Sequence, residues 1–236
     1  DYKSYYEDFG SLLIGFTINK YCYITARYTP EIMDYYTRIC YSQIETADDN
    51  ENIKHNGVRG VLEYLKITEG VDISHFSDLP AQTGIGSSSS FIVGLLKAFM
   101  ALTVKYWEPH AFLTALQSKK ILADTAIHIE RELLKESGGI QDQIWAVYGG
   151  FNSIHIDNAG FHVRPMPLSL EFLDSFKSHS LLIYTGRSRQ SFKIAQSHDS
   201  KSSEVHKHAI KDLAADAYKA FENEDIYVSV SYTHLT

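Results

Sequence analysis

Hydrophobic and polar residues alternate in several short runs in the first third of the chain. The runs 12–18 and 21–27 are rich in β-branched and aromatic residues and are separated by a polar turn pair, which predicts a β-hairpin. A third strand is expected within 35–45, and a fourth over 71–76. Short strands are therefore grouped near the start of the chain.

Helical spacing of apolar residues dominates the middle of the chain. It begins at Ile53 and stops at Gly70, and a strongly apolar helix is expected over 91–104. An apolar stripe over 121–133 predicts another helix, and 141–148 predicts a short amphipathic one. Strands early and helices later indicate a mixed α/β or α+β architecture with two layers.

The last third of the chain predicts fewer elements. The segments 151–156 and 161–163 alternate like the strands of a hairpin, 181–184 reads as a buried strand, and 209–221 reads as a helix with one apolar face. Because few strands are available to cover that helix, we expect its apolar face to remain in water.

Composition and charge exclude several classes of protein. The 236 residues are 44% hydrophobic, which is enough for a buried core and argues against intrinsic disorder. A net charge of −7 makes duplex DNA and anionic membranes poor partners, and no apolar run reaches the length of a membrane helix. Cys22 and Cys40 do not form a C-x-x-C pair, which suits a reducing cytoplasm.

The segment from Gly84 to Ser90 is the strongest indication of chemistry. Two glycines permit a tight turn, and small hydroxyl residues lead directly into an apolar helix, whose N-terminal amide groups can bind phosphate. A flexible linker is the alternative, but a linker need not precede a well-formed helix. The segment lacks the lysine of a P-loop and the G-x-S-x-G spacing of a hydrolase.

Four segments resemble the GHMP kinases, the superfamily of galactokinase, homoserine kinase and mevalonate kinase. The segment 80–89 resembles the second motif of that family. The pair 127–132 and 139–143 is similar to the stretch that brings an acidic metal ligand and a catalytic aspartate together, and 149–152 and 184–189 are similar to the sugar-kinase branch. Within that branch the chain most resembles the D-glycero-D-manno-heptose 7-phosphate kinases.

The resemblance implies an α+β fold with two domains. The first, 1–177, would be an ATP-binding domain of the ribosomal protein S5 domain 2-like type, and the second, 178–236, an incomplete ferredoxin-like domain. We therefore expect the first domain to fold well and the second incompletely.

The resemblance also assigns roles to residues. Asp142 would be the catalytic base that accepts the proton of a sugar hydroxyl, and Glu130 and Ser88 would hold Mg²⁺. ATP would be bound by the residues of the second motif, which are Pro80, Gly84, Ile85, Gly86, Ser87, Ser88 and Ser89. Within this loop Ser89 is expected to start the helix and pack away from the ligand.

Each role has a structural alternative. Glu130 alternates with other charged residues and could lie on a solvated helix face, and Asp142 could cap the helix that follows it. Asp1 matches the aspartate that ends the first family motif and would bind sugar hydroxyls. Arg187 and Arg189 could pair with a substrate phosphate or could simply aid solubility.

The chain departs from the family at both ends. Residues before Asp1 that the first motif would contain are absent, the glycine-rich third motif is not found, and 230–236 looks like translated sequencing adapter, although it also alternates like a strand. We expect a fragment of a cytoplasmic sugar-phosphate kinase that acts on the anomeric hydroxyl of a heptose 7-phosphate. A kinase of unphosphorylated fucose or galactose and a non-catalytic sensor of sugar and ATP are the alternatives.

Overall fold

The computed structural model describes residues 1–81, 83–102, 115–183, 186 and 204–225. These residues form two compact units, one of 19–147 and the other of 1–18 together with 148–183, 186 and 204–225. Each unit contains both helices and strands, so the expected α+β class is confirmed. The units divide the chain differently from the expected domains 1–177 and 178–236, whose boundary stays a prediction. No described helix is long and apolar enough to cross a membrane.

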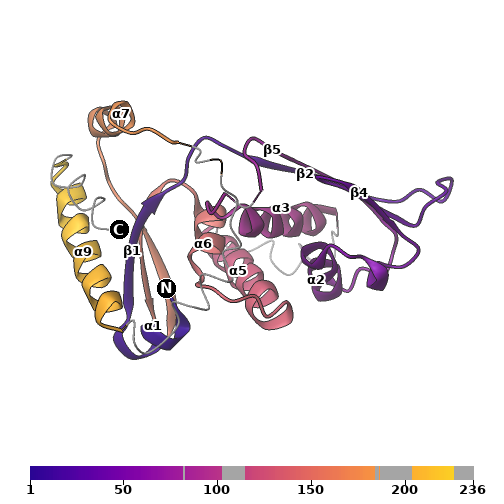
Figure 1. Cartoon of the computed structure of the whole chain (residues 1–236), viewed down its shortest axis with the longest axis horizontal. Coiled ribbons are helices and arrows are strands. Elements are labelled where there is room, and N and C mark those ends of the chain that lie inside the picture. The colour runs from indigo at the N-terminus through magenta and orange to yellow at the C-terminus, as the bar shows by residue number, and fades with distance from the viewer. Residues whose placement is uncertain (82, 103–114, 184–185, 187–203, 226–236) are drawn as a thin grey trace. The chain divides into compact units, whose positions relative to one another are not determined.

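The unit of residues 19–147 is built on a four-stranded sheet in the order β2-β5-β3-β4 (Figure 1). Its strands are β2 (Cys22–Tyr28), β3 (Thr37–Cys40), β4 (Ile44–Ala47) and β5 (Val71–Ser77). The interior strand β5 runs antiparallel to β2 and parallel to β3, and β3 and β4 are antiparallel. The expected third strand is therefore two short strands, since the chain reverses between Cys40 and Ile44.

The helices of this unit lie on one side of this sheet (Figure 1). They are α2 (Asn56–Leu65), α3 (Ser87–Leu102), α5 (Ala115–His128), a π-helical turn (Ile129–Leu133) and α6 (Gln141–Tyr148), with a short 3-10 turn at Asn50–Asn52. In Figure 1, α2 and α3 lie along the same side of the strands, and α3 packs on β2. The apolar positions that predicted these helices supply the core, including Val58, Leu62, Leu95, Phe99 and Ile129.

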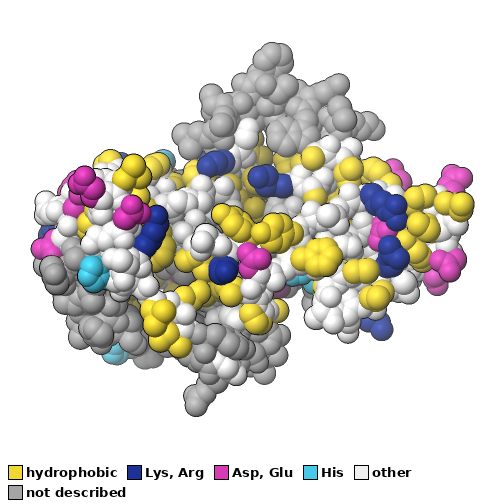
Figure 2. All heavy atoms as spheres, turned by 90° about the horizontal axis from the view of Figure 1, so that it is seen from above, with side chains coloured by type: hydrophobic (Ala, Val, Ile, Leu, Met, Phe, Trp, Pro, Cys, Tyr) yellow, Lys and Arg dark blue, Asp and Glu magenta, His cyan; other side chains and the backbone are white. Residues whose placement is uncertain are grey.

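The opposite face of the sheet carries exposed aromatic and basic side chains. Tyr23 and Phe76 lie opposite each other in the β2–β5 ladder, and both are exposed. Figure 2 looks onto this face and shows basic side chains next to an acidic one among hydrophobic ones.

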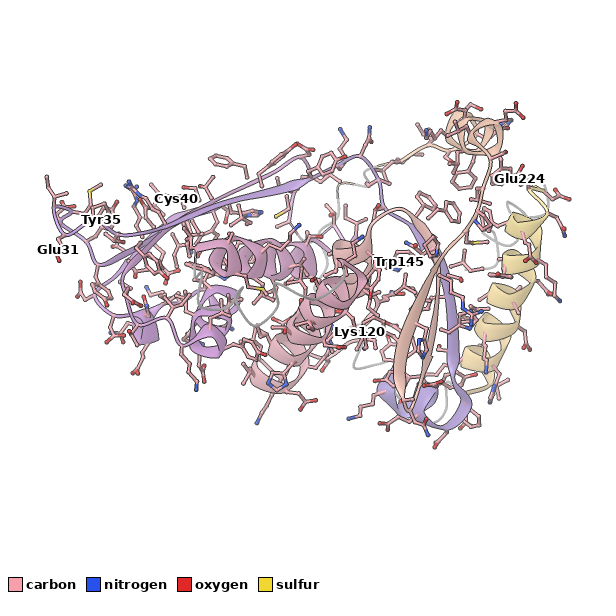
Figure 3. All side chains as sticks on the ribbon, turned by 180° about the vertical axis from the view of Figure 1, so that it is seen from behind. Glu31, Tyr35, Cys40, Lys120, Trp145 and Glu224 are labelled. Atoms are coloured by element: carbon pink, nitrogen blue, oxygen red, sulfur yellow. The ribbon has the colours of Figure 1, made fainter. Side chains whose placement is uncertain are left out.

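Seen from behind, Lys120 projects from α5 and Trp145 lies on α6 (Figure 3).

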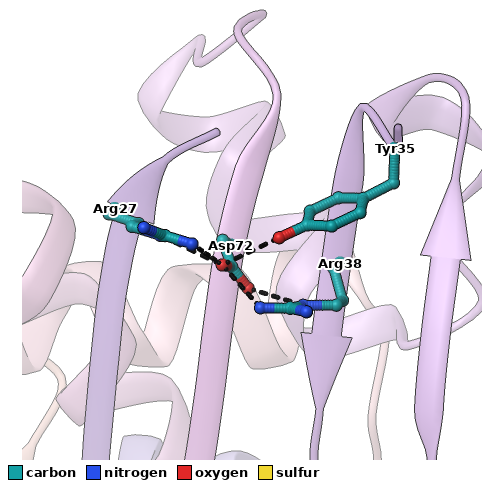
Figure 4. A network of polar contacts seen from close by, with 4 residues as sticks. All are labelled: Arg27, Tyr35, Arg38 and Asp72. Carbon is teal, nitrogen blue, oxygen red and sulfur yellow. Dashed lines mark hydrogen bonds and ion pairs between the residues drawn. The ribbon is translucent and has the colours of Figure 1, made fainter. Parts of the chain in front are cut away.

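A network of hydrogen bonds around Asp72 links three strands of the sheet (Figure 4). Arg27 on β2 and Arg38 on β3 each donate two hydrogen bonds to this β5 carboxylate, at 2.7–3.0 Å. Tyr35 adds a third donor through its hydroxyl group, at 3.2 Å. Asp72 is buried, so these bonds compensate for the loss of its hydration.

The other unit contains a three-stranded antiparallel sheet in the order β1-β6-β7. Its elements are α1 (Lys3–Phe9), β1 (Ser11–Phe16), β6 (Phe151–Asp157), β7 (Gly160–Pro165), α7 (Leu170–Ser178) and α9 (Glu204–Glu222). Met166, Phe172 and Phe221 form its small core together with Phe151 and Phe176. The predicted β6–β7 hairpin is confirmed.

The predicted hairpin between 12–18 and 21–27 is wrong. β1 pairs with β6, and β2 pairs with β5, each over its whole length. The chain passes from one compact unit to the other between Ile18 and Asn19, so the two strands belong to different sheets. Alternation identifies a strand and its buried face, but it does not specify the partner.

Two expectations for the last third of the chain are also wrong. Leu181, Leu182 and Ile183 are exposed and form no strand, whereas Tyr184 lies outside the described residues. The apolar face of α9 does not remain in water, because Phe221 is buried and contacts Phe151 of β6. The strands β1 and β6, from the start and the middle of the chain, contact this helix. The sequence near α9 does not indicate this packing.

Candidate active site

The loop between β5 and α3 is held in place at its first residue. Asp78 and Tyr21 exchange two hydrogen bonds, from Tyr21 N to Asp78 Oδ2 at 2.9 Å and from Asp78 N to Tyr21 O at 3.0 Å. Further along, the Thr83 hydroxyl donates to Pro80 O at 3.2 Å. These bonds fix the path by which the chain approaches the start of α3.

The two glycines of this loop adopt backbone angles that disfavour other residues. Gly84 and Gly86 have φ values of 79° and 74°. A Cβ atom on Gly86 would lie 3.2 Å from Cγ of Asp142, so the glycine also permits a close approach to that carboxylate. The α3 helix begins immediately afterwards at Ser87 and presents the positive end of its dipole to this region, together with amide groups that have no partner within the helix.

Glu130 is buried in the same unit, with 2% of its surface exposed. Its Oε2 atom accepts hydrogen bonds from Ser89 Oγ at 3.1 Å and Gln143 Nε2 at 2.6 Å, and Arg131 Nη2 lies 3.6 Å from it. Within the described part of the chain, Oε1 is buried and has no hydrogen-bond partner. The solvated-face alternative for Glu130 is therefore wrong.

Burial raises the pKa of Glu130 to about 7. Arg131, Ser89 and Gln143 oppose this change, but they do not outweigh the lost hydration. An unpaired, buried carboxylate oxygen is a position that a divalent cation would satisfy. The described residues contain no group of three acidic, histidine or cysteine side chains that could hold a metal by themselves. A site with one carboxylate, completed by phosphate oxygens and water, fits Mg²⁺.

Asp142 lies in the first turn of α6 and is half-buried beside Gly86. Burial raises its pKa, and the positive charge of Arg131 acts in the opposite direction. The helix begins one residue earlier than Asp142, so this carboxylate is within the helix and not a cap that precedes it. A rigid carboxylate with a raised pKa next to a phosphate-type loop is suited to act as a general base.

Arg131 places its positive charge near the carboxylates of Glu130 and Asp142, which the sequence did not indicate. It lies in the π-helical turn and donates from Nη1 to Glu136 O at 2.8 Å, while Glu136 N donates to Glu130 O at 2.9 Å. Gly138 allows the guanidinium group to pack closely, since a Cβ atom there would lie 3.3 Å from two of its nitrogens. π-helical turns of this kind occur frequently at functional sites.

The structure brings most of the predicted site into one unit. The residues of that set within 19–147 are Pro80, Gly84, Ile85, Gly86, Ser87, Ser88, Ser89, Glu130 and Asp142. Ser88 is exposed, and Ser89, which was expected to pack away from a ligand, is buried against Glu130. Asp1 belongs to the other unit, and Arg187 and Arg189 lie outside the described residues. The assigned roles stay predictions.

Sequence reasoning did not single out Gln143, whose side chain donates a hydrogen bond to Oε2 of Glu130. Gln143 is fully buried next to Ile144, on the inner side of a short amphipathic helix. A polar residue at the apolar face of a helix is the signal that could have identified it, because a buried amide requires a partner.

Known proteins resemble the chain in sequence and in structure. Residues 55–150 match the family described as GHMP kinases N terminal domain. A D-glycero-alpha-D-manno-heptose 7-phosphate kinase from Campylobacter jejuni is 30% identical over 173 residues, which cover 71% of this chain and 48% of that protein. The chain thus spans about half the length of this curated relative.

Solved structures share the fold. A D-glycero-D-manno-heptose 1-phosphate kinase from Bacteroides thetaiotaomicron superimposes with a TM-score of 0.77 at 24% identity, covering 98% of this chain and 71% of its own. The mevalonate kinase of Methanococcus jannaschii gives a TM-score of 0.59 at 18% identity, with coverage of 92% and 69%.

Proposed function

We propose that this chain, whose residues 55–150 match the GHMP kinases N terminal domain, is an ATP-dependent kinase that phosphorylates a hydroxyl group of a sugar phosphate. The observation that carries the proposal is the position of the Asp142 carboxylate against Gly86, at the N-terminal end of α3. A base and a phosphate-binding helix end thus come together from segments far apart in the sequence.

Different groups of the site have different roles in the proposed phosphoryl transfer. The amide groups at the start of α3 bind the phosphates of ATP, and Asp142 accepts the proton of the sugar hydroxyl as its oxygen attacks the γ-phosphorus. Glu130, through its unpaired Oε1, and Ser88 would hold Mg²⁺. The ion would neutralise charge on the phosphate oxygens. Catalysis then depends on positioning and electrostatics.

The substrate we propose is a heptose 7-phosphate, phosphorylated at its anomeric hydroxyl. Support comes from the Campylobacter jejuni relative, which is named for that substrate. Arg187 and Arg189 would bind the existing phosphate, and Asp1 would bind sugar hydroxyl groups. Arg187→Ala and Arg189→Ala should each raise KM for the heptose phosphate, and an unchanged KM would assign both arginines to solubility.

Asp142→Asn tests the proposed base. The amide keeps the shape of the side chain but cannot accept the proton, so we expect kcat to fall about 10²- to 10⁴-fold while ATP affinity changes little. Asp124→Asn on α5 is the matched control, because Asp124 is exposed and its ion-pair partner among the described residues is Lys120.

Unchanged turnover of Asp142→Asn would remove Asp142 from the mechanism. The parent chain should also consume ATP only when a suitable sugar phosphate is present. Nucleotide binding without ATP consumption across a panel of sugars and sugar phosphates would overturn the kinase proposal and favour a ligand sensor.

A further inference from the structure

The donors around Glu130 converge on a single oxygen atom. Ser89 and Gln143 both donate to Oε2, and the nearest guanidinium nitrogen of Arg131 is also closest to Oε2. Oε1 has no partner among the described residues, although it is equally removed from water. Among the described residues, Oε2 of Glu130 therefore has hydrogen-bond donors and Oε1 has none. The bonds to Oε2 fix the orientation of the carboxylate.

Gln143 makes the shortest of these contacts, 2.6 Å from Nε2 to Oε2. Its side chain is fully buried, so its position is set by packing. The carboxylate also sets the orientation of the amide, because a flipped amide would place Oε1 of Gln143 against Oε2 of Glu130 and leave two acceptors facing each other.

The amide has an unpartnered atom of its own. Oε1 of Gln143 is buried without a hydrogen-bond partner in the described part of the chain, like Oε1 of Glu130. Two buried oxygens without partners, on side chains joined by one hydrogen bond, are unfavourable unless a cation or its bound water lies near them. This pairing points to a ligand at Glu130 independently of the loop sequence.

Gln143 also follows Asp142 directly on α6. The same helical turn therefore carries the proposed base and the strongest donor to the proposed metal ligand. A displacement of this turn would move both carboxylates together.

We infer that Gln143 is a positioning residue. Its amide group holds Oε2 of Glu130, so that Oε1 is presented to a divalent cation. It also links that cation site to the turn that bears Asp142. The inference rests on the proposed function, in which Glu130 holds Mg²⁺. It adds a residue that affects binding of the cation through its hydrogen bond to Glu130.

Gln143→Met tests the inference, because methionine has a similar length and no donor group. Mn²⁺ serves as the probe, and its affinity is measured by electron paramagnetic resonance with the full chain and a non-hydrolysable ATP analogue. We expect Mn²⁺ affinity to fall about tenfold or more, as is usual when a partner of a metal ligand is removed. The Mg²⁺ concentration for half-maximal turnover should rise similarly, and high Mg²⁺ should restore much of kcat.

Asn50→Leu is the matched control. Asn50 is another buried amide in the same unit. It donates to Ile67 O and Glu69 O, and among the described residues it shares no hydrogen-bond partner with Glu130. This variant should lose thermal stability and retain parental Mn²⁺ affinity. Equal losses of affinity in both variants would indicate general loosening and would overturn the inference.

Gln143→Leu provides a second variant if Gln143→Met does not fold. It removes the donor without adding a charged oxygen next to the cation site, so its Mn²⁺ affinity should also fall. Affinity within about twofold of the parent in either folded variant would overturn the positioning role.

Glu130→Gln separates the inference from the proposed function. If Glu130→Gln loses Mn²⁺ affinity and the Gln143 variants do not, only the positioning role is wrong. If Glu130→Gln also binds Mn²⁺ like the parent, the metal role of Glu130 fails, and the inference fails with it.

Discussion

The buried carboxylate of Glu130 lowers the stability of the folded state when it is ionised, because burial removes its hydration. Its pKa is raised from 4.5 to about 7 by burial, so the folded state holds its proton more tightly than the unfolded state does. The free energy of unfolding should therefore fall as pH rises from the unfolded pKa to the folded one, and the full penalty is present above about pH 7. Such a cost is expected of a residue retained for ligand binding and not for stability.

Glu130→Gln should stabilise the metal-free chain at pH 8. The neutral amide can still accept from Ser89, and removal of the charge should add up to about 3 kcal/mol to the free energy of unfolding. Urea unfolding with EDTA at pH 5 and pH 8 measures the effect, and the gain should be smaller at pH 5. A variant that is less stable than the parent at pH 8 would contradict this account.

Gly86→Ala should affect both stability and activity. A left-handed backbone angle disfavours alanine by about 1–2 kcal/mol, and the new Cβ would also press on Asp142. Gly150→Ala is the control, because Gly150 has φ +76° and no atom of the described residues lies within 4 Å of an added Cβ. Urea unfolding should show a loss for both variants that is at least as large for Gly86→Ala, whereas kcat should fall only for Gly86→Ala.

The strands β2, β5 and β3 depend on the Asp72 network. Burial by itself would raise the pKa of Asp72, but the hydrogen bonds from Arg38 and Arg27 outweigh it and the pKa is lowered. Stability from this group is therefore present above the unfolded pKa and is lost as pH falls through the lower folded pKa. Because both arginines are partly exposed, the contribution is smaller than that of a fully buried pair.

Asp72→Asn should lower the free energy of unfolding by about 1–2 kcal/mol at pH 7. The variant keeps the shape of the side chain but loses the charge that holds the two arginines. Chemical denaturation at pH 7 and pH 3 tests this, and the difference from the parent should shrink at pH 3. The exposed pair of Lys120 and Asp124 offers the comparison, since Asp124→Asn should change stability by less than about 0.5 kcal/mol.

At the scale of the whole molecule, each compact unit has its own hydrophobic core. Phe221 belongs to the small core of the unit that contains α9, and Phe99 belongs to the core of the 19–147 unit. Phe221→Ala and Phe99→Ala should each cost about 3–5 kcal/mol, because each creates a cavity.

Hydrogen exchange should show which unit responds to each substitution. Phe221→Ala should reduce amide protection in β1, β6 and β7, and Phe99→Ala in α2, α3 and β5. Loss of protection across both units from either single substitution would show that they unfold together and that the separate cores do not define separate cooperative units.

The sequence by itself determined the elements whose signals are local. Helices α2, α3 and α6, the β6–β7 hairpin and the glycine and serine loop before α3 were all predicted from spacing within short windows. Helical periodicity, turn residues and glycine flexibility act over about ten residues, so a single sequence contains them. The resemblance to GHMP kinases came from the same local motifs.

Only the tertiary structure decided the partners of these elements. It placed β1 and β2 in different sheets, buried Glu130 where a solvated helix face was the alternative, and brought Gln143 to its carboxylate. Strand pairing and the burial of a charge depend on residues far apart along the chain, whose contacts form only when the whole core packs. The residues predicted to be catalytic could thus be named from sequence, but the burial and the hydrogen-bond partners of their side chains could not.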